Sequence, residues 1–252
     1  MTGLDAGSLA REGGAHISYL KRAGRTPGIV WLGGFKSEMT ATKATALDAW
    51  AAREGRAFVR FDYFGHGASS GNFREGTVTR WRDDVLAVLD ALTDGPQVLV
   101  GSSMGAWLAL LAALARPKRV AALLLIAPAA DFTEKLLWAS FDVDVKRQIL
   151  ETGAWLRPSA YDPKPYPITR SLIEDGRKHL LLDGPIALSC PVRIVQGMKD
   201  PDVPWQHAMK LVGALGPDTQ ITLVKDGDHR LSKPHEIALI ERTLSALVAD
   251  HT

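Results

Sequence analysis

The sequence predicts an α/β fold, in which a mostly parallel sheet is covered by helices on both faces. Short apolar runs alternate with longer segments of helical periodicity along most of the 252 residues, as strand–helix–strand crossovers require. Most of the apolar runs lack an alternating polar face, which is expected of strands buried on both sides. With 46% hydrophobic residues, a chain of this length is expected to form one large domain with a buried core.

Six strands follow from runs rich in Val, Ile, Leu and Phe. Gly33, Asp62, Gly101 and Gly197 stand at or just beyond the ends of four of these runs, where such residues favour turns. A further strand is expected near the N-terminus, after His16. The six predicted strands are Ile29–Leu32, Ala57–Phe61, Gln97–Val100, Val120–Ile126, Val192–Val195 and Gln220–Val224.

Five segments between these runs have the spacing of amphipathic helices. In the second of them, Trp81, Val85 and Leu89 recur at every fourth position and therefore share one helical face. Two of the segments begin at proline, which the first helical turn tolerates because its N–H needs no intrahelical partner. The predicted helices are Ala41–Arg53, Val78–Leu92, Ala106–Ala115, Pro204–Leu215 and Pro234–Ala249.

The alternation of strands and helices fails between residues 131 and 189. This segment holds mostly helical-looking pieces and a proline-rich run at residues 161–167. An insertion this long inside an α/β domain is rarely structureless. We interpret it as a helical cap over the open end of the sheet, inserted into a core formed by residues 1–130 and 190–252.

Large apolar side chains in the predicted cap are candidates for a substrate pocket. We expect Trp138 and Phe141 to contact the substrate, with Leu136, Leu137 and Trp155 as further lining. The alternative is that these side chains only anchor the cap to the core.

The composition excludes several classes of protein. The 30 basic and 28 acidic residues give a net charge of +2, and no basic stripe favours nucleic-acid binding. No apolar stretch approaches the roughly 18 residues of a membrane span, so no stable membrane insertion is expected. One cysteine, Cys190, excludes a disulfide scaffold. The first eleven residues lack the features of a signal peptide, which predicts a cytoplasmic protein. The oligomeric state stays open.

The strongest motif is Gly101-Ser102-Ser103-Met104-Gly105, a G-x-S-x-G pattern between a predicted strand and a predicted helix. A sharp strand–turn–helix exposes the central serine at the sheet edge, so we expect Ser103 to be a nucleophile. The same pattern recurs at residues 67–71 around Ser69. That stretch leads into a loop rather than a helix, so Ser69 is interpreted as a structural serine.

A serine hydroxyl needs an adjacent base to act as a nucleophile near neutral pH. The best candidate is His229, in the loop between the last predicted strand and the last predicted helix. Asp200 follows the preceding predicted strand and would orient and charge-stabilise the imidazole, in the chain order Ser, Asp, His. Asp202, two residues later, remains an alternative acid. His66, in a Gly-rich loop, is expected to line the pocket wall.

Acyl transfer also requires donors for the developing oxyanion. The backbone N–H of Met104, directly after the expected nucleophile, supplies one. The loop Gly33-Gly34-Phe35-Lys36 follows the first predicted strand and would supply the second. We expect this to be the Phe35 N–H, with Gly34 as the alternative donor and as a substrate-binding residue.

With these residues placed, the chain resembles the α/β-hydrolases along nearly its whole length. The family's loop pattern is present at Asp62-Tyr63-Phe64-Gly65-His66-Gly67-Ala68-Ser69, which explains the second G-x-S-x-G as structural. Closer similarity is to a mitochondrial branch described as palmitoyl-protein thioesterases and acyl-glucuronide esterases. It is carried by the stretches Arg60–Tyr63, Gly95–Ser103, Gly197–Asp200, Val203–Trp205 and Asp228–Arg230. The resemblance implies Ser103, Asp200 and His229 as nucleophile, acid and base. No Arg-rich, acid-poor transit segment is seen, so the mitochondrial address is not carried over.

The predicted function is a serine esterase or a depalmitoylase-like thioesterase that works through an acyl-enzyme and needs no cofactor or metal. Its substrate would be a small-molecule or acyl-protein ester or thioester. One alternative is a serine aminopeptidase-like enzyme, for which an acidic patch should line the cap. Another is a binding protein of the same fold that has lost catalysis. Dehalogenases and epoxide hydrolases of this fold use an aspartate nucleophile, against which Ser103 argues.

Overall fold

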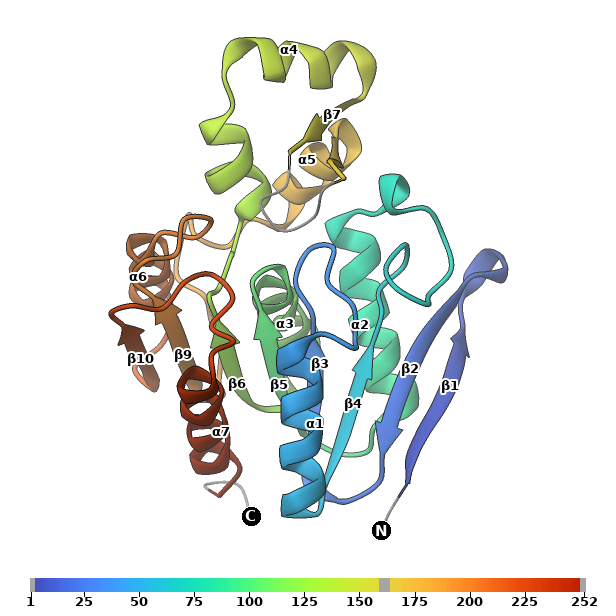
Figure 1. The fold of residues 1–252 in the computed structure, drawn as a ribbon, viewed down its shortest axis with the longest axis vertical. Coiled ribbons are helices and arrows are strands. Elements are labelled where there is room, and N and C mark those ends of the chain that lie inside the picture. Colours follow the sequence, from blue (N-terminus) through green and yellow to red (C-terminus); the bar gives the residue numbers. More distant parts are fainter. Residues whose placement is uncertain (1–2, 159–163, 250–252) are drawn as a thin grey trace.

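An eight-stranded sheet runs through the centre of the molecule in the order β1-β2-β4-β3-β5-β6-β9-β10 (Figure 1). The computed structural model describes residues 3–158 and 164–249. The six strands from β4 to β10 in this order are parallel, while β1 and β2 add an antiparallel edge. The strands are β1 (Leu4–Ala10), β2 (His16–Arg22), β3 (Arg25–Leu32), β4 (Arg56–Phe61), β5 (Gln97–Ser102), β6 (Val120–Ile126), β9 (Val192–Gly197) and β10 (Thr219–Val224).

The predicted α/β class is confirmed, and each of the six predicted strands is present in the parallel part of the sheet. In β3, Ile29 and Trp31 face one hydrophobic core while Val30 and Leu32 face the other. All four are buried, which explains why the apolar runs show no alternation. β1 escaped prediction because its residues are mostly exposed and include few β-branched side chains.

Helices cover both faces of this sheet (Figure 1). Residues of α1 and α7 pack in the core on one face, and residues of α2, α3 and α6 pack in the core on the other. The helices of this layer structure are α1 (Thr42–Glu54), α2 (Val78–Leu92), α3 (Met104–Ala115), α6 (Trp205–Ala214) and α7 (Pro234–Ala249). Short 3-10 turns lie at Glu12–Gly14, Phe73–Glu75 and Pro117–Arg119. Among the described helices, none combines the length and the apolar character needed to cross a bilayer.

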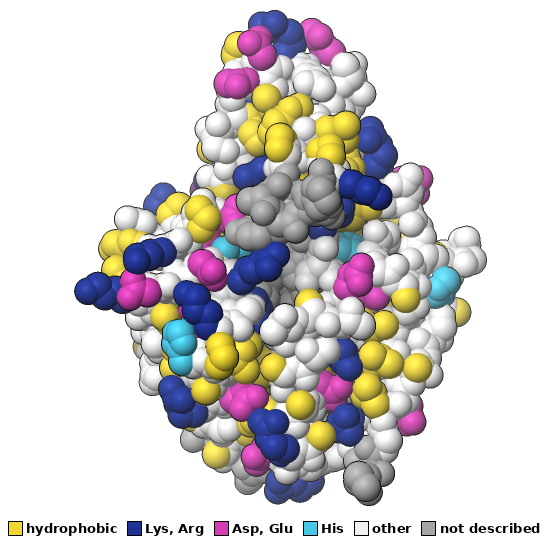
Figure 2. All heavy atoms as spheres, viewed as in Figure 1, with side chains coloured by type: hydrophobic (Ala, Val, Ile, Leu, Met, Phe, Trp, Pro, Cys, Tyr) yellow, Lys and Arg dark blue, Asp and Glu magenta, His cyan; other side chains and the backbone are white. Residues whose placement is uncertain are grey.

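The segment between β6 and β9 lies beyond the carboxyl ends of the parallel strands (Figure 1). It contains a π-helical turn (Thr133–Leu137), α4 (Val143–Thr152), β7 (Ala154–Arg157), β8 (Tyr166–Thr169) and α5 (Arg170–Gly176), with 3-10 turns at Trp138–Ser140 and Arg177–His179. Figure 2 shows hydrophobic side chains on its outer surface. Three large ones, Val143, Leu150 and Leu156, are exposed.

The helical pieces expected between residues 131 and 189 are present, but an antiparallel ribbon of β7 and β8 accompanies them. Sequence periodicity did not reveal this ribbon because both strands are only four residues long and β8 contains Pro167. Proline is tolerated in such an edge strand when its position needs no N–H. Residues 161–163 of the proline-rich run lie outside the described residues.

The side chain of Asp84 holds the loop after β4 through a hydrogen bond to the loop backbone. Its side chain is buried on α2 and accepts a hydrogen bond from the Phe64 N–H at 2.9 Å. The Arg11 guanidinium lies 3.4 Å from the same carboxyl group. Burial nevertheless raises the pKa of Asp84 to about 6, because a buried carboxylate loses its hydration.

We predict that Asp84→Asn removes a pH-dependent loss of folding stability, which is caused by the burial of this carboxyl group. Because folding raises the pKa of Asp84 from 3.8 to about 6, the folded state binds more protons than the unfolded state between these pH values. The contribution of Asp84 to the free energy of unfolding therefore falls as pH rises through that window. Between pH 4 and pH 7, the free energy of unfolding of Asp84→Asn should therefore rise by roughly 1–3 kcal/mol relative to that of the wild type. Urea unfolding of both proteins at several pH values measures this. A difference that is constant with pH would contradict the prediction.

Candidate active site

The turn from β5 into α3 holds Ser103 in a strained backbone conformation. Ser103 has φ 55° and ψ −117°, a region that non-glycine residues rarely adopt. The surroundings impose it, because the Ser103 N–H donates to the Ile126 carbonyl at 2.9 Å and the Ser103 carbonyl accepts from the Ala129 N–H at 3.2 Å. The Ser103 side chain makes no capping hydrogen bond to the helix, so its hydroxyl is available to other partners.

The glycines on either side of this turn are required by close backbone contacts. A Cβ at Gly101 would lie 2.4 Å from the Gly105 carbonyl oxygen, and a Cβ at Gly105 would lie 2.1 Å from the Leu32 carbonyl oxygen. These contacts bring α3 directly against the end of β3. The G-x-S-x-G spacing therefore reflects the packing of two backbone segments as well as the turn itself.

A continuous hydrogen-bonded chain links Ser103, His229 and Asp200. The Ser103 Oγ lies 3.1 Å from His229 Nε2, and His229 Nδ1 lies 2.8 Å from Asp200 Oδ2. Since a carboxylate can only accept, Nδ1 carries the proton and Nε2 is free to accept from the serine hydroxyl. The three residues follow β5, β10 and β9, whose carboxyl ends share one edge of the parallel sheet (Figure 1).

Asp200 is held by several N–H donors in addition to the imidazole. Its side chain is fully buried. Its Oδ1 accepts from the N–H groups of Asp202 and Val203 at 2.9 and 2.8 Å, and its Oδ2 also accepts from Gln196 Nε2 at 3.2 Å. Such donors fix the orientation of the carboxyl group. The role of Gln196 was missed from the sequence, where the only signal is one amide at the end of an apolar strand.

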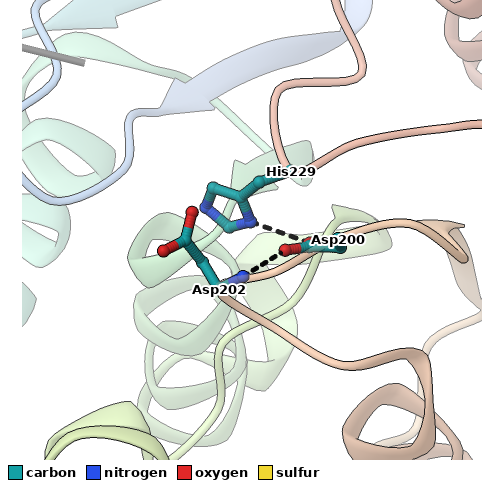
Figure 3. Close-up of side chains that lie close together, drawn as sticks. All are labelled: Asp200, Asp202 and His229. Atoms are coloured by element: carbon teal, nitrogen blue, oxygen red, sulfur yellow. Dashed lines mark hydrogen bonds and ion pairs between the residues drawn. The ribbon is translucent and has the colours of Figure 1, made fainter. Parts of the chain in front are cut away.

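Asp202 lies on the other side of the His229 ring from Asp200 (Figure 3). One potential ligand atom from each of Asp200, Asp202 and His229 lies within 4.8 Å of the others, so the three could offer ligands to a cation. The oxygens of Asp200 are already saturated by N–H donors, which favours proton transfer over metal binding at this position. Of the two acids left open by the sequence, Asp200 is the one bonded to His229 Nδ1.

The loop after β3 runs alongside Ser103. A Cβ at Gly34 would lie 3.4 Å from the Ser103 Cβ and 4.0 Å from its Oγ. Among the hydrogen bonds of the described residues, the N–H groups of Phe35 and Met104 have no protein acceptor. Met104 is also the first residue of α3, where the helix dipole favours negative charge.

The chain is similar to known proteins both in sequence and in structure. A model described as the alpha/beta hydrolase family matches residues 27–238. The chain belongs to the alpha/beta hydrolase family. The mouse protein named "Palmitoyl-protein thioesterase ABHD10, mitochondrial" is 43% identical over 235 residues, which are 92% of this chain and 79% of that protein. The human protein of the same name is 41% identical over 235 residues, 92% of this chain and 76% of that protein.

Solved structures of this hydrolase family agree with the sequence relatives. A putative hydrolase from Agrobacterium vitis superimposes with a TM-score of 0.93 at 42% identity, covering 98% of this chain and 99% of that one. The mouse alpha/beta hydrolase domain-containing protein 10 superimposes with a TM-score of 0.91 at 40% identity, covering 98% of this chain and all of that one. The resemblance inferred from the sequence motifs is therefore confirmed, and the chain is a hydrolase by descent.

The predicted cytoplasmic location is wrong in the light of these relatives, which are named as mitochondrial proteins. The prediction depended on finding no targeting pattern in the first residues. A missing pattern carries no positive information about the compartment in which a protein works, whereas the names of the related hydrolases point to mitochondria.

Trp138 and Phe141 are not brought to Ser103 by any described contact. The Trp138 ring lies beneath Lys146 and Arg177, whose charged groups are 5.6 and 5.1 Å from its centroid. Phe141 packs edge to face with Trp155 at 5.2 Å. Their role in substrate binding stays a prediction.

The Phe35 side chain is surrounded by other aromatic rings. It packs on Phe73 and Trp81 from the core and on Phe132 and Tyr166 from the segment above, with centroid distances of 4.9 to 5.7 Å. The contact of Tyr166 with Phe35 was not predicted, because Tyr166 lies in the proline-rich run, where no helix or strand was expected.

Ser69 lies in a structural position. Its Oγ donates to the Asp62 carbonyl at 2.5 Å and accepts from the Ser18 N–H at 2.8 Å. These bonds tie the loop after β4 to β2. The hydroxyl is thus engaged by backbone groups on both sides, in keeping with its interpretation as a structural serine.

We predict that Gly105→Ala destabilises this hydrolase by about 3 kcal/mol or more, because the new methyl group would overlap backbone carbonyls rather than movable side chains. Gly213→Ala is the matched control: it lies in α6 with nothing within 4 Å of its Cβ position and should stabilise by about 0.5–1 kcal/mol. Urea unfolding measures both. Equal effects of the two substitutions would show that the tight contact at Gly105 is not required.

Proposed function

We propose that this protein is a serine hydrolase that cleaves acyl thioesters or carboxylic esters through an acyl-enzyme on Ser103. The observation that carries the proposal is the hydrogen-bonded chain from Ser103 through His229 to the buried Asp200. A nucleophile, its base and the group that orients the base are thus within reach of one another, as this chemistry requires.

In the proposed mechanism, His229 Nε2 takes the proton of the Ser103 hydroxyl as Oγ attacks the acyl carbon. The imidazolium is stabilised by Asp200, which accepts from Nδ1. The N–H groups of Met104 and Phe35 stabilise the oxyanion. His229 then protonates the leaving thiol or alcohol, and in the second half-reaction it activates the water that releases the acid and restores Ser103.

The acyl substrate is proposed from the relatives and from the surroundings of the loop. The mouse and human relatives are named palmitoyl-protein thioesterases, and aromatic rings surround Phe35 beside the expected oxyanion donors. An apolar acyl group suits such surroundings, because its transfer from water is favourable in proportion to the area buried. We further propose that residues 131–189 act as a cap over this site, with Trp138 and Phe141 among the residues that contact the acyl group.

The first test is labelling of the purified protein with a fluorophosphonate probe, followed by mapping of the adduct by mass spectrometry. We expect an adduct on Ser103 that is lost in Ser103→Ala and strongly reduced in His229→Ala. Hydrolysis of acyl thioesters should fall at least about a thousandfold in Ser103→Ala while the fold is kept. No adduct on folded wild-type protein, or undiminished turnover by Ser103→Ala, would refute the proposed nucleophile.

The second test compares two neighbouring acids. Asp200→Asn should lower kcat by roughly 10³–10⁴-fold, because an amide no longer fixes and charge-stabilises the imidazole. Asp202→Asn should lower it by less than about tenfold, since the backbone N–H that Asp202 donates to Asp200 is kept. Steady-state kinetics on one thioester decide the matter. Equal losses in the two variants would mean that Asp200 is not the acid of the relay.

The same assays separate the alternatives. Thioesters and esters of increasing chain length report acyl preference, and aminoacyl arylamides report an aminopeptidase. A folded protein that resists the probe and turns over none of these substrates would support a binding protein of the same fold.

A further inference from the structure

The loop that carries the Phe35 N–H is held at three points. The Gly33 carbonyl accepts from the Tyr63 hydroxyl at 3.2 Å, and the Lys36 N–H donates to His66 Nε2 at 3.1 Å. Between them, the Gly34 carbonyl accepts from the Ser37 N–H at 3.0 Å. The peptide group between Gly34 and Phe35 is thus flanked by fixed groups on both sides.

These bonds determine where the Phe35 N–H can point. In a trans peptide the N–H is directed opposite to the carbonyl of the preceding residue. The Gly34 carbonyl is turned toward Ser37, so the Phe35 N–H is directed away from that turn. Lys36 has a φ of 59°, an unfavourable conformation for a lysine, and its N–H bond to His66 stabilises it.

The protonation state of His66 follows from its partners. Because the Lys36 N–H is the donor, Nε2 must be unprotonated. The proton is therefore on Nδ1, which donates to the Phe64 carbonyl at 3.2 Å. The Trp81 indole N–H donates to the same carbonyl at 3.1 Å, so the acceptor for Nδ1 is itself fixed.

The surroundings keep the His66 ring neutral and in place. The ring is 4% exposed and lies 5.1 to 5.6 Å from the ring centroids of Tyr63, Phe73 and Trp81. Burial lowers the pKa of His66 to about 4. Near neutral pH the imidazole is therefore uncharged, and Nε2 accepts a hydrogen bond.

We propose that His66 is a positioning residue for the oxyanion donor: its Nε2 holds the Lys36 N–H and so keeps the neighbouring Phe35 N–H directed at the acyl oxygen. The inference rests on the proposed function, since it assigns His66 a part in the same site. The sequence predicts that His66 lines the pocket wall, but the residue is buried, and both of its ring nitrogens bond to backbone groups. Its effect is exerted through the backbone of residues 33–37.

The test uses two substitutions of matched shape, His66→Gln and His66→Met. Gln keeps a strong acceptor of the right length for the Lys36 N–H, whereas Met has a similar length and offers only a thioether sulfur, which is a weak acceptor. We expect His66→Met to lower kcat for p-nitrophenyl butyrate by about 10–100-fold, a substantial part of the loss on removing an oxyanion donor. KM should stay within about twofold of the wild type. His66→Gln should recover most of kcat.

Amide hydrogen exchange of residues 33–37, measured on the same proteins, reports the loop without reference to activity. Exchange should be faster in His66→Met and close to wild type in His66→Gln. If His66→Met fails to fold, His66→Phe keeps an aromatic ring without the acceptor and takes its place. Equal kcat for the Gln variant and the Met or Phe variant, a change confined to KM, or unchanged exchange in the Met or Phe variant would overturn the proposal.

The two proposals fail separately. A wild-type protein that neither hydrolyses esters nor reacts with the fluorophosphonate probe would refute the proposed function. In that event the exchange of residues 33–37 would still decide whether His66 holds the loop: equal exchange in all variants would refute the positioning role.

Discussion

The strained backbone of Ser103 is the constraint around which the site is arranged. A serine with φ 55° and ψ −117° costs roughly 1–3 kcal/mol of folding free energy. The conformation is kept by the backbone hydrogen bonds of Ser103 with Ile126 and Ala129 and by the packing of Gly105 against Leu32. This conformation places the hydroxyl beyond the sheet edge, where it makes no capping hydrogen bond to the helix. The same contact of α3 with the end of β3 brings the loop of Gly34 and Phe35 beside the serine. The proposed nucleophile and the proposed oxyanion donors are therefore positioned by the same packing contact.

The parallel sheet accounts for the meeting of residues that are far apart in the chain. Ser103, Asp200 and His229 follow three strands whose carboxyl ends share an edge (Figure 1), so short loops suffice to bring them together. Each loop is then fixed by its own bonds. Asp200 is held by backbone N–H groups and Gln196, and the Asp228 carboxylate accepts from the N–H groups just after His229.

Much of this could be predicted from the sequence because it depends on local patterns. Buried strands such as Val120–Ile126 and the amphipathic helix Val78–Leu92 have the same bounds in the structure. The order of Ser103, Asp200 and His229 followed from motif context. The relation of Asp202 to Asp200, the part played by Gln196 and the ribbon of β7 and β8 could not be predicted. They depend on side-chain direction and on pairing between short segments, which spacing along one chain does not encode.

The contrast between the two sides of the site bears on how specificity can vary. Below Ser103, the residues Asp200, His66 and Asp84 are buried and bonded to backbone groups, so apolar replacements there would leave unpaired polar groups in the core. Above them, the contacts with Phe35 are made by aromatic faces, Phe132 and Tyr166, which exchange for other apolar groups at small cost. Under the proposed mechanism, the buried polar residues determine the reaction, whereas the aromatic residues that contact Phe35 are free to vary with the acyl group. Phe35 belongs to both sets, because its N–H is the proposed oxyanion donor and its ring packs on Phe132 and Tyr166. Repacking of these two aromatic residues would therefore act directly on the proposed donor.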